Sequence, residues 1–543
     1  MKNAKTFLQA TALQLTLFIS LFFSLPSAAA NPFLPLWEYI PDGEPYIFED
    51  PDRPGQYRVY IYGSHDSMRK DYCGREQVLW SAPINDLNNW RYDGIIFESK
   101  TDALGQWLNK NGTGDILFAP DIVEIKEKNG KKTYYLYPNN QGKGRNGMVA
   151  KSDRPDGPFK VCNWNPESPQ ETIGVLGFDP AVLADDDGRI YGYWGFQESF
   201  GSELNPNTMA TLKEGTQPVK DMIPNLKQDG IFRFFEASSI RKIKDKYVFV
   251  YSRWTANGEF GFPGSNYTLA YAYSNQPLGP FTYGGTLIDG RGRDKDADGN
   301  PIPTATPGGN THGSILEING KWYVFYHRQT GVNEYSRQAM VAPIEVEVTE
   351  GPNGKVEISE AEYTSEGFET EGLNPYKRYS AGIACYYTGP RPARHSWPNM
   401  EFSGSYILPT YADGKEKRFS PYDLRINSNP VVNNTSGSVV GYKYFNFDHL
   451  KKSKGTALSV NLKPQGTEGR LEIFVGNPRE AEGGIKIGNL HIPRNAPPVV
   501  TEMHIPLSRI KHLKGKKALF FVFSSSTPDR SICELHDFAF IRK

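Results

Sequence analysis

The sequence predicts an all-β protein, a five-bladed β-propeller followed by a C-terminal β-sandwich. Three observations support this fold class. Short segments rich in aromatic and β-branched residues recur along the whole chain. Asn-Gly, Asp-Gly and Lys-rich turns separate many of them, as in β-hairpins. Five segments between residues 40 and 330 repeat one pattern, and no stretch indicates a substantial helix.

Composition sets limits on domain number and on partners. The chain has 543 residues, too many for one ordinary core, so several domains are expected. Lys+Arg and Asp+Glu both number 61, so no overall electrostatic field attracts nucleic acid or an anionic membrane. Aromatic residues make up 13% and supply flat apolar surfaces on which sugars can stack.

Residues 1–30 are typical of a secretory signal peptide. Lys2 and Lys5 precede the apolar run of residues 12–26, and the small residues "SAAA" precede Asn31. We therefore expect an exported protein, periplasmic or extracellular. An uncleaved membrane anchor is the alternative, but no other stretch approaches the roughly 20 apolar residues of a membrane span. The sequence does not indicate an oligomeric state.

The four cysteines form no CxxC motif, which excludes the common metal and redox motifs of that type. They allow three disulfide pairings, and buried free thiols are equally compatible with the sequence. These residues are Cys73, Cys162, Cys385 and Cys533.

Each repeat consists of a polar entry residue, a short apolar strand, a turn and an aromatic-rich strand. The repeats recur at intervals of roughly 50 to 80 residues, which favours the blades of a propeller. Because the first strand of each blade lines the central channel, the entry residues should meet near one end of the axis. Taken singly, each could be an ordinary turn or cap residue. The five are Asp42, Asp121, Asp179, Glu236 and His312.

Paired carboxylates across a pocket suit hydrolysis of a glycosidic bond, which needs one protonated and one ionised group. Glu236 in "RFFEASSI" has apolar neighbours that raise a carboxyl pKa, so we assign it as the general acid. Asp42 lies in a more polar turn and suits the general base. Asp121, with Asp179 as a second candidate, would raise the pKa of the acid by like-charge repulsion. For an inverting enzyme the two catalytic carboxylates should lie about 6.5–9.5 Å apart.

Other residues are candidates for binding substrate or metal. His312 in "NTHGS" could ligate a cation at the axis, although a lone His is more often structural. A hard cation would take most of its ligands from water. Several tryptophans are candidates for sugar stacking, and Trp254 is selected from them, together with His65 in "YGSHD".

The domain boundaries follow the end of the repeat. Residues 31–363 are assigned to the propeller and residues 364–382, "TSEGFETEGLNPYKRYSAG", to a linker. Residues 383–543 contain further short strands separated by turns, which favours a β-sandwich.

Residues 31 to 350 resemble glycoside hydrolase family 43, five-bladed propeller enzymes. The resemblance rests on an acid at the first blade entry, "APD", "FEASS", and "HGS" followed by "WYVFYHR". It implies inversion with Asp42 as base, Asp121 as the residue that tunes the acid, and Glu236 as acid. It also implies a pocket-lining Asp179, a sugar contact by Arg337 rather than Arg328, and a water-mediated calcium ion near His312.

The resemblance departs from the family pattern at the first blade. The family commonly has Asp-Pro there, whereas this chain has Asp42-Gly43 followed by Glu44-Pro45. Asp42 is preferred as the base and Glu44 remains the alternative. The C-terminal unit resembles family 6 carbohydrate-binding modules more faintly, and it could either bind sugar or brace the propeller.

The expected function is that of an exported inverting glycosidase that needs no cofactor for its chemistry. Exo action on α-L-arabinofuranose, β-D-xylose or galactofuranose of a polysaccharide is expected, because the long inserts before blades two and five favour a walled pocket. An endo-acting enzyme of the same fold, a non-catalytic carbohydrate-binding propeller and a scaffold protein are the alternatives. Zincin, GxSxG and P-loop motifs are absent from the sequence.

Overall fold

A computed structural model describes residues 30–127, 129–225, 227, 230–410, 428–453 and 455–542. The predicted signal peptide, apart from Ala30, lies outside the described residues. In the described ranges, helix is confined to the short 3-10 turns η1 (Glu259–Gly261), η2 (Ala381–Ile383), η4 (Glu480–Glu482) and η5 (Ile510–His512). None of the described helices has the length and apolarity needed to cross a membrane.

Five antiparallel sheets follow one another along residues 44–344 and correspond to the five predicted repeats. The first contains β1 (Glu44–Glu49), β2 (Tyr57–Tyr62), β3 (Glu76–Pro83) and β4 (Arg91–Glu98). The second contains β5 (Asp121–Lys126), β6 (Lys132–Tyr137), β7 (Ala150–Ser152) and β8 (Lys160–Val161). The third contains β11 (Ala181–Ala184), β12 (Ile190–Trp194), β13 (Phe200–Leu204) and β14 (Val219–Lys220).

The fourth and fifth sheets complete the ring. The fourth contains β15 (Phe234–Ile243), β16 (Lys246–Arg253), β17 (Thr268–Ser274) and β18 (Thr282–Asp289), and the fifth contains β21 (Ser314–Ile318), β22 (Lys321–Gln329) and β23 (Arg337–Ile344). Three peripheral hairpins are β9 (Trp164–Asn165) with β10 (Ser168–Thr172), β19 (Arg293–Lys295) with β20 (Pro301–Pro303), and β24 (Val346–Val348) with β25 (Val356–Ile358).

The first strands of the five sheets surround a common axis. Strand β11 contacts β5 and β15, and β21 contacts β15 and β1. The ring closes where Tyr46 of β1 donates a hydrogen bond to Asp121 Oδ1 of β5 at 2.7 Å. The propeller is therefore confirmed, and the start of each first strand lies near the axis, where the site is built.

The C-terminal unit is a sandwich of two antiparallel sheets. One sheet contains β26 (Tyr379–Ser380), β30 (Tyr406–Ile407), β31 (Val431–Asn434), β38 (Cys533–Arg542), β33 (Thr456–Pro464) and β36 (Thr501–Pro506). The other contains β27 (Tyr386–Thr388), β32 (Val439–Asn446), β37 (Lys516–Ser524), β34 (Gly469–Val475) and β35 (Ile485–Ile492). A separate hairpin pairs β28 (Arg394–Ser396) with β29 (Asn399–Glu401).

The predicted linker over residues 364–382 is wrong in its C-terminal part. Strand β26 pairs with β38, so the sandwich includes residues before 383. Leu373 is fully buried and forms a bridge with Phe445 of β32. The C-terminal part of the segment is thus packed into the second domain, because its apolar residues are buried against the sheets of the sandwich.

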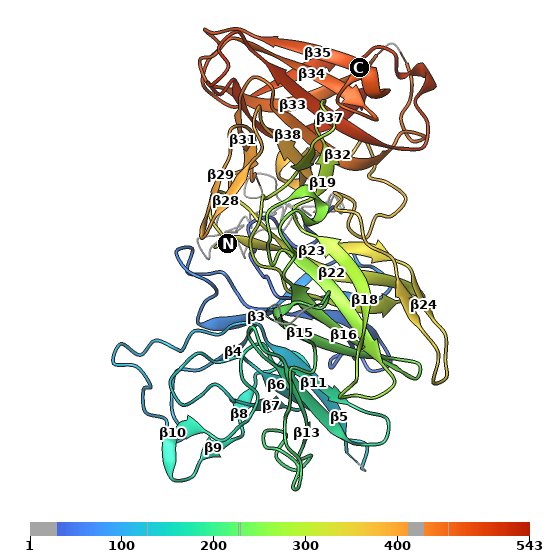
Figure 1. Ribbon diagram of the computed structural model, residues 1–543. Coiled ribbons are helices and arrows are strands. Elements are labelled where there is room, and N and C mark those ends of the chain that lie inside the picture. Colours follow the sequence, from blue (N-terminus) through green and yellow to red (C-terminus); the bar gives the residue numbers. More distant parts are fainter. Residues whose placement is uncertain are drawn as a thin grey trace, which may run out of the picture.

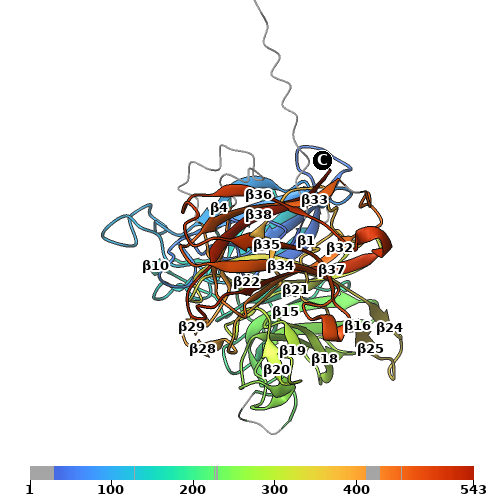
Figure 2. The same cartoon turned by 90° about the horizontal axis from the view of Figure 1, so that it is seen from above.

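The sandwich stacks on one end of the propeller, as Figures 1 and 2 show. One continuous apolar core includes Val324 and Met340 of blade five together with Val440 and Phe538 of the sandwich. Fully buried Arg328 adds polar contacts, donating from Nη1 to Ala384 O at 2.8 Å. Burial of this apolar surface joins the two domains firmly.

The four cysteines are free thiols; Cys73, Cys385 and Cys533 are buried and Cys162 is exposed.

Candidate active site

Three of the predicted entry residues occupy equivalent places in their blades. Asp42, Asp179 and His312 each lie two residues before the first strand of a blade. Asp42 and Asp179 have φ values of 59° and 50°, in the left-handed region that Asp tolerates better than most residues. This shared backbone turn directs both carboxylates toward the same end of the axis.

Glu236 reaches the same region through a bulge. Strand β15 shifts its register on both sides of Glu236, and Ala237 has a φ of 68°. A bulge of this kind re-aims a side chain. The Ala237 amide donates to Asp179 Oδ2 at 2.9 Å, which ties the bulge of blade four to the entry turn of blade three.

Asp121 does not belong to this group, and its predicted role as the residue that tunes the acid is wrong. Asp121 is the first residue of β5, as Glu44 is of β1, whereas Asp42 lies two residues before its strand. Two residues of strand correspond to about 6.5 Å along the axis. Asp121 instead accepts hydrogen bonds from the Tyr46 hydroxyl and the Val182 amide. The carboxylate whose charge raises the pKa of Glu236 most is Asp179.

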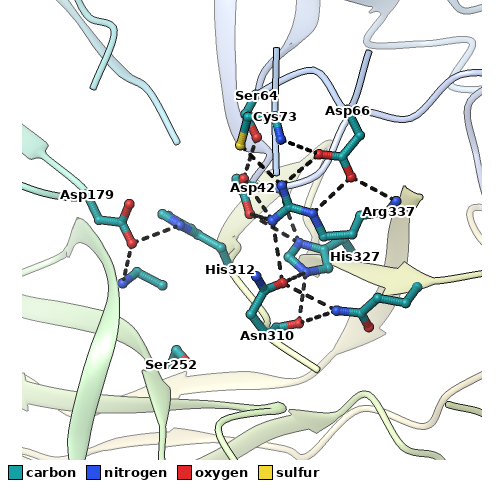
Figure 3. Close-up of polar contacts among 12 residues, drawn as sticks. Asp42, Ser64, Asp66, Cys73, Asp179, Ser252, Asn310, His312, His327 and Arg337 are labelled. Atoms are coloured by element: carbon teal, nitrogen blue, oxygen red, sulfur yellow. Dashed lines mark hydrogen bonds and ion pairs between the residues drawn. The ribbon is translucent and has the colours of Figure 1, made fainter. Parts of the chain in front are cut away.

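Asp42 is buried in a network of donors, drawn in Figure 3. Ser64 donates to Oδ2, and Arg337 Nη1 lies 3.1 Å from Oδ1. Burial opposes ionisation, but the charge of Arg337, supported by the hydrogen bond from Ser64, holds the pKa of Asp42 below its usual value. Asp42 is therefore a carboxylate at neutral pH.

His327 contributes as a neutral ring. Burial lowers the pKa of His327 to about 3. Its Nε2 lies 2.9 Å from Asn310 O and its Nδ1 accepts from the Asp42 amide at 3.3 Å. These contacts place the proton on Nε2, so His327 fixes the Asp42 backbone without forming an ion pair.

Arg337 is fully engaged by the protein, so its predicted contact with a sugar is corrected to a positioning role. Nε and Nη2 donate to Asp66 at 3.0 and 2.8 Å, Nη1 to Asp42, and further contacts reach Asn310 Oδ1 and Cys73 Sγ. These contacts account for the five N–H groups of a guanidinium. Arg337 therefore holds Asp42 in place, with its N–H groups taken up by described protein residues.

Glu236 and Asp179 are carboxyl groups whose pKa values are both raised. Burial, followed by the charges of Asp179 and Asp42, raises the pKa of Glu236 well above its usual value. Burial and Asp42 raise the pKa of Asp179 as well, but Asn139 Nδ2 and the Ala237 amide each donate to it at 2.9 Å. Such donors favour the charged form, so Glu236 holds the proton of the pair.

Glu44, the alternative base, is placed differently from Asp42. Its Oε2 accepts from Arg241 Nη2 at 2.7 Å, and Arg241 also lies over the Tyr46 ring. Burial raises the pKa of Glu44 to about 7, with Arg241 opposing this. Glu44 thus belongs to a structural cluster with Asp121, deeper along the axis than Asp42.

Two buried polar atoms, one on Glu44 and one on His312, fit the cation that the sequence predicts near His312. Glu44 Oε1 and His312 Nε2 lie 4.0 Å apart, and neither has a hydrogen-bond partner among the described residues. Burial lowers the pKa of His312 to about 4, so the ring is neutral and can face a cation. Among the described residues no group of three or more His, Cys, Asp or Glu could hold a metal. A cation here would therefore be held mainly by water and would contribute positive charge at the axis, near Asp179.

His65 is not a substrate-binding residue in this structure. Its Nδ1 lies 3.1 Å from Glu76 Oε1 and its Nε2 3.0 Å from Glu38 Oε1. Burial lowers its pKa, but the two carboxylates outweigh this and raise the pKa of His65 to about 9. Both ring nitrogens are therefore occupied in a structural ion pair, which corrects the prediction.

Trp254 lies at one end of a row of aromatic rings beside the acids. Successive centroids along the row are 5.1–5.8 Å apart. Phe178 directly precedes Asp179 and Phe235 directly precedes Glu236. Phe196 is 49% exposed, so part of the row faces solvent. The row, which could contact a sugar, contains Phe118, Phe178, Phe196, Phe235 and Trp254.

Sequence reasoning missed Ser64 and Asp66, which hold Asp42 and Arg337. The signal was available in the alternation of "GSHD" after β2, which puts Ser64 and Asp66 on the side opposite to His65. The role of Asp66 depends on Arg337, far away in the sequence, so alternation alone would not have identified it.

Comparisons with known proteins identify the family of this chain. The family model of glycosyl hydrolases family 43 matches residues 43–350, which include all five blades. A "Xylosidase/arabinosidase" of Thermoclostridium stercorarium is 33% identical over 445 residues, covering 78% of this chain and 84% of that protein. An "Arabinoxylan arabinofuranohydrolase" of Paenibacillus polymyxa is 28% identical over 370 residues, covering 64% of this chain and 53% of that protein.

Among solved structures, one similar structure is that of a family 43 arabinoxylan arabinofuranohydrolase from Bacillus subtilis in complex with cellotetraose. The match covers 94% of this chain and 97% of that one, with 21% sequence identity and a TM-score of 0.42. The extent of the family match and the identity to the Thermoclostridium protein decide the classification. The chain belongs to the glycosyl hydrolases of family 43.

Proposed function

We propose that this glycosidase hydrolyses its substrate with inversion, using Asp42 as general base, Glu236 as general acid and Asp179 as the residue that raises the pKa of the acid. One observation carries this proposal. Two carboxyl groups at the same end of the axis have pKa values displaced in opposite directions, Asp42 downward and Glu236 upward. Such a divergence matches the separate roles of acid and base.

The chemical step follows from these protonation states. Asp42 accepts a proton from a water molecule whose oxygen attacks the anomeric carbon. Glu236 gives its proton to the glycosidic oxygen as the bond to the leaving sugar breaks. Asp42 ends protonated and Glu236 ionised, and exchange with solvent restores both. Asp179 favours the protonated state of Glu236 before the step by its negative charge.

For the substrate, we propose exo release of α-L-arabinofuranose or β-D-xylose from a xylan-type polysaccharide. The printed names of the relatives, xylosidase/arabinosidase and arabinoxylan arabinofuranohydrolase, support this class. The partly exposed aromatic row beside Asp179 and Glu236 offers apolar faces for a sugar ring.

The test is product analysis on arabinoxylan, arabinan and galactofuranosyl substrates, together with nitrophenyl glycosides. We expect a single monosaccharide to be released, with ¹H NMR showing that its first-formed anomer is inverted. Retention of configuration would exclude the base role of Asp42. If wild type and Glu236→Gln were equally inactive on every substrate, an enzymatic function would be excluded, and a carbohydrate-binding propeller would be the remaining function.

We further propose that the protein is exported. The support is the positively charged start, the apolar run of residues 12–26 and the small residues before Asn31. Expression of the full chain in a secreting host, followed by N-terminal sequencing of the exported protein, should give a first residue near Asn31. A protein that stays inside the cell with residues 1–30 intact would contradict this.

A further inference from the structure

The hairpin β28–β29 of the C-terminal domain pairs with a loop of the propeller. The loop, residues 330–336, joins β22 to β23 and ends beside Arg337. Asn399 forms an antiparallel bridge with Asn333, the Met400 amide donates to Val332 O at 2.9 Å, and the Glu334 amide donates to Pro398 O at 3.1 Å. These contacts extend the propeller loop by main-chain pairing, which holds the hairpin in a defined place.

Glu334 joins three parts of the chain at this place. It is 1% exposed. One carboxylate oxygen accepts from Tyr72 OH of the β2–β3 loop, and the other contacts His395 Nε2 of the hairpin. A buried carboxylate needs such partners, so the pairing favours a single position of the hairpin against blades one and five.

The hairpin lies close to the catalytic base. The Arg337 guanidinium carbon is 5.1 Å from the centroid of the Tyr72 ring, and Arg337 in turn binds Asp42 at 3.1 Å. Tyr335 packs edge-on against Tyr72, with ring centroids 5.1 Å apart. Contacts through Tyr72 and Arg337 therefore link the hairpin to Asp42.

Trp397, at the turn of the hairpin, is anchored but open to solvent. Its Nε1 donates to Tyr72 OH at 3.4 Å, yet the residue is 69% exposed. Val332, on the loop that pairs with the hairpin, is 46% exposed. An indole that is fixed by its polar edge and leaves its face in water is suited to bind an apolar surface, such as the C–H face of a pyranose ring.

We propose that Trp397 is a stacking platform for a pyranose ring of the polysaccharide on the leaving-group side of the cleaved bond, so that the C-terminal domain completes the substrate site. This inference rests on the proposed function. The proposed exo action sets the side, because every sugar of the polymer other than the released one stays with the leaving oxygen. Tyr72 and Arg337 lie between Trp397 and Asp42, and the aromatic row beside Asp179 and Glu236 belongs to other blades. Trp397 thus meets the part of a polymer that stays outside the catalytic centre.

The test compares substrates with and without a leaving sugar. Trp397→Ala should raise KM for arabinoxylan or a substituted xylo-oligosaccharide about tenfold, in the range found when a central binding tryptophan is truncated. Hydrolysis of the glycosyl fluoride of the released sugar should stay within about twofold of wild type, because fluoride occupies no sugar subsite. Trp397→Phe should restore most of the affinity for the polymer.

The matched control is Tyr57→Ala. Tyr57 is also an exposed aromatic residue, at 45%. It is the first residue of β2, and the site lies beyond the opposite end of that strand, at Ser64. This variant should leave both substrates unaffected. An unchanged KM for the polymer in Trp397→Ala, or an equal loss on the fluoride, would overturn the inference while the proposed glycosidase activity stands.

Calorimetric titration with xylohexaose separates this inference from the proposed function. If the wild type hydrolyses no substrate, the proposed function fails, but xylohexaose binding that is lost in Trp397→Ala and kept in Tyr57→Ala still supports the platform. If the inactive wild type binds no xylohexaose, both proposals fail.

Discussion

Arg337 bridges two buried carboxylates, donating from Nη1 to Asp42 Oδ1 at 3.1 Å and from Nη2 to Asp66 Oδ1 at 2.8 Å. Asp66 thereby orients the guanidinium, and the guanidinium in turn keeps Asp42 ionised despite its burial. The base of the proposed reaction is therefore set by residues from both ends of the propeller domain, blade one and blade five.

Substitution of Arg337 should displace the acidic limb of the pH profile. In Arg337→Ala, Asp42 loses the cation that lowers its pKa, so its pKa rises under the effect of burial. Activity requires ionised Asp42, and the acidic limb of kcat/KM should therefore move to higher pH. Arg337→Lys should show a smaller shift, since it keeps the charge but not the forked geometry. An unchanged acidic limb in both variants would show that Arg337 does not act through Asp42.

Glu236→Gln should separate acid catalysis from binding. The variant lacks the proton for the leaving oxygen, and general acids contribute about 10²–10⁴-fold to such steps. We expect a loss of this size on xylan-type substrates and a much smaller loss on nitrophenyl glycosides, whose leaving group needs little protonation. KM should change little. Equal losses on both substrate types, measured by steady-state kinetics, would argue against an acid role.

Asp179→Asn and Asp121→Asn should have different effects on the basic limb of the pH profile of kcat/KM. Activity requires protonated Glu236, whose pKa is raised by burial and by Asp179. Removing the Asp179 charge lowers this pKa, so the basic limb of kcat/KM should move to lower pH. Asp121→Asn should leave the limb in place, because Asp121 contacts Tyr46 and the Val182 amide. The reverse pattern would restore Asp121 as the residue that tunes the acid.

His65→Gln should change stability rather than catalysis. Burial lowers the pKa of His65, but Glu38 and Glu76 raise it overall to about 9, above its unfolded value near 6.5. Its stabilising contribution is therefore complete below about pH 6.5 and is lost as the pH rises through about 9. The difference in Tm between wild type and variant should shrink over this range. A large rise in KM with no difference in Tm would return His65 to the substrate site.

The repeat was visible in the sequence because its signals are local. Turn residues and alternating aromatic strands recur in all five blades, and Asp42, Asp179, Glu236 and His312 stand at the starts of their first strands. Asp121 shows the limit of this reasoning. A displacement of two residues keeps a side chain on the same face of a strand, so the pattern alone could not show that Asp121 matches Glu44 instead of Asp42.

The sequence by itself determined the all-β class, the five repeats, the second domain and the candidate acids, since hydrophobic alternation and turn chemistry are read within a few residues. Only the tertiary structure decided what each polar group does. Arg337 is fully used by Asp66, Asp42 and their neighbours, His65 lies between two glutamates, and Asp179 is the charge beside Glu236. Trp397 likewise reaches Tyr72 only because the sandwich packs on blade five. A pKa or a free donor depends on groups within a few ångströms in space, and most of those groups lie far apart in the chain.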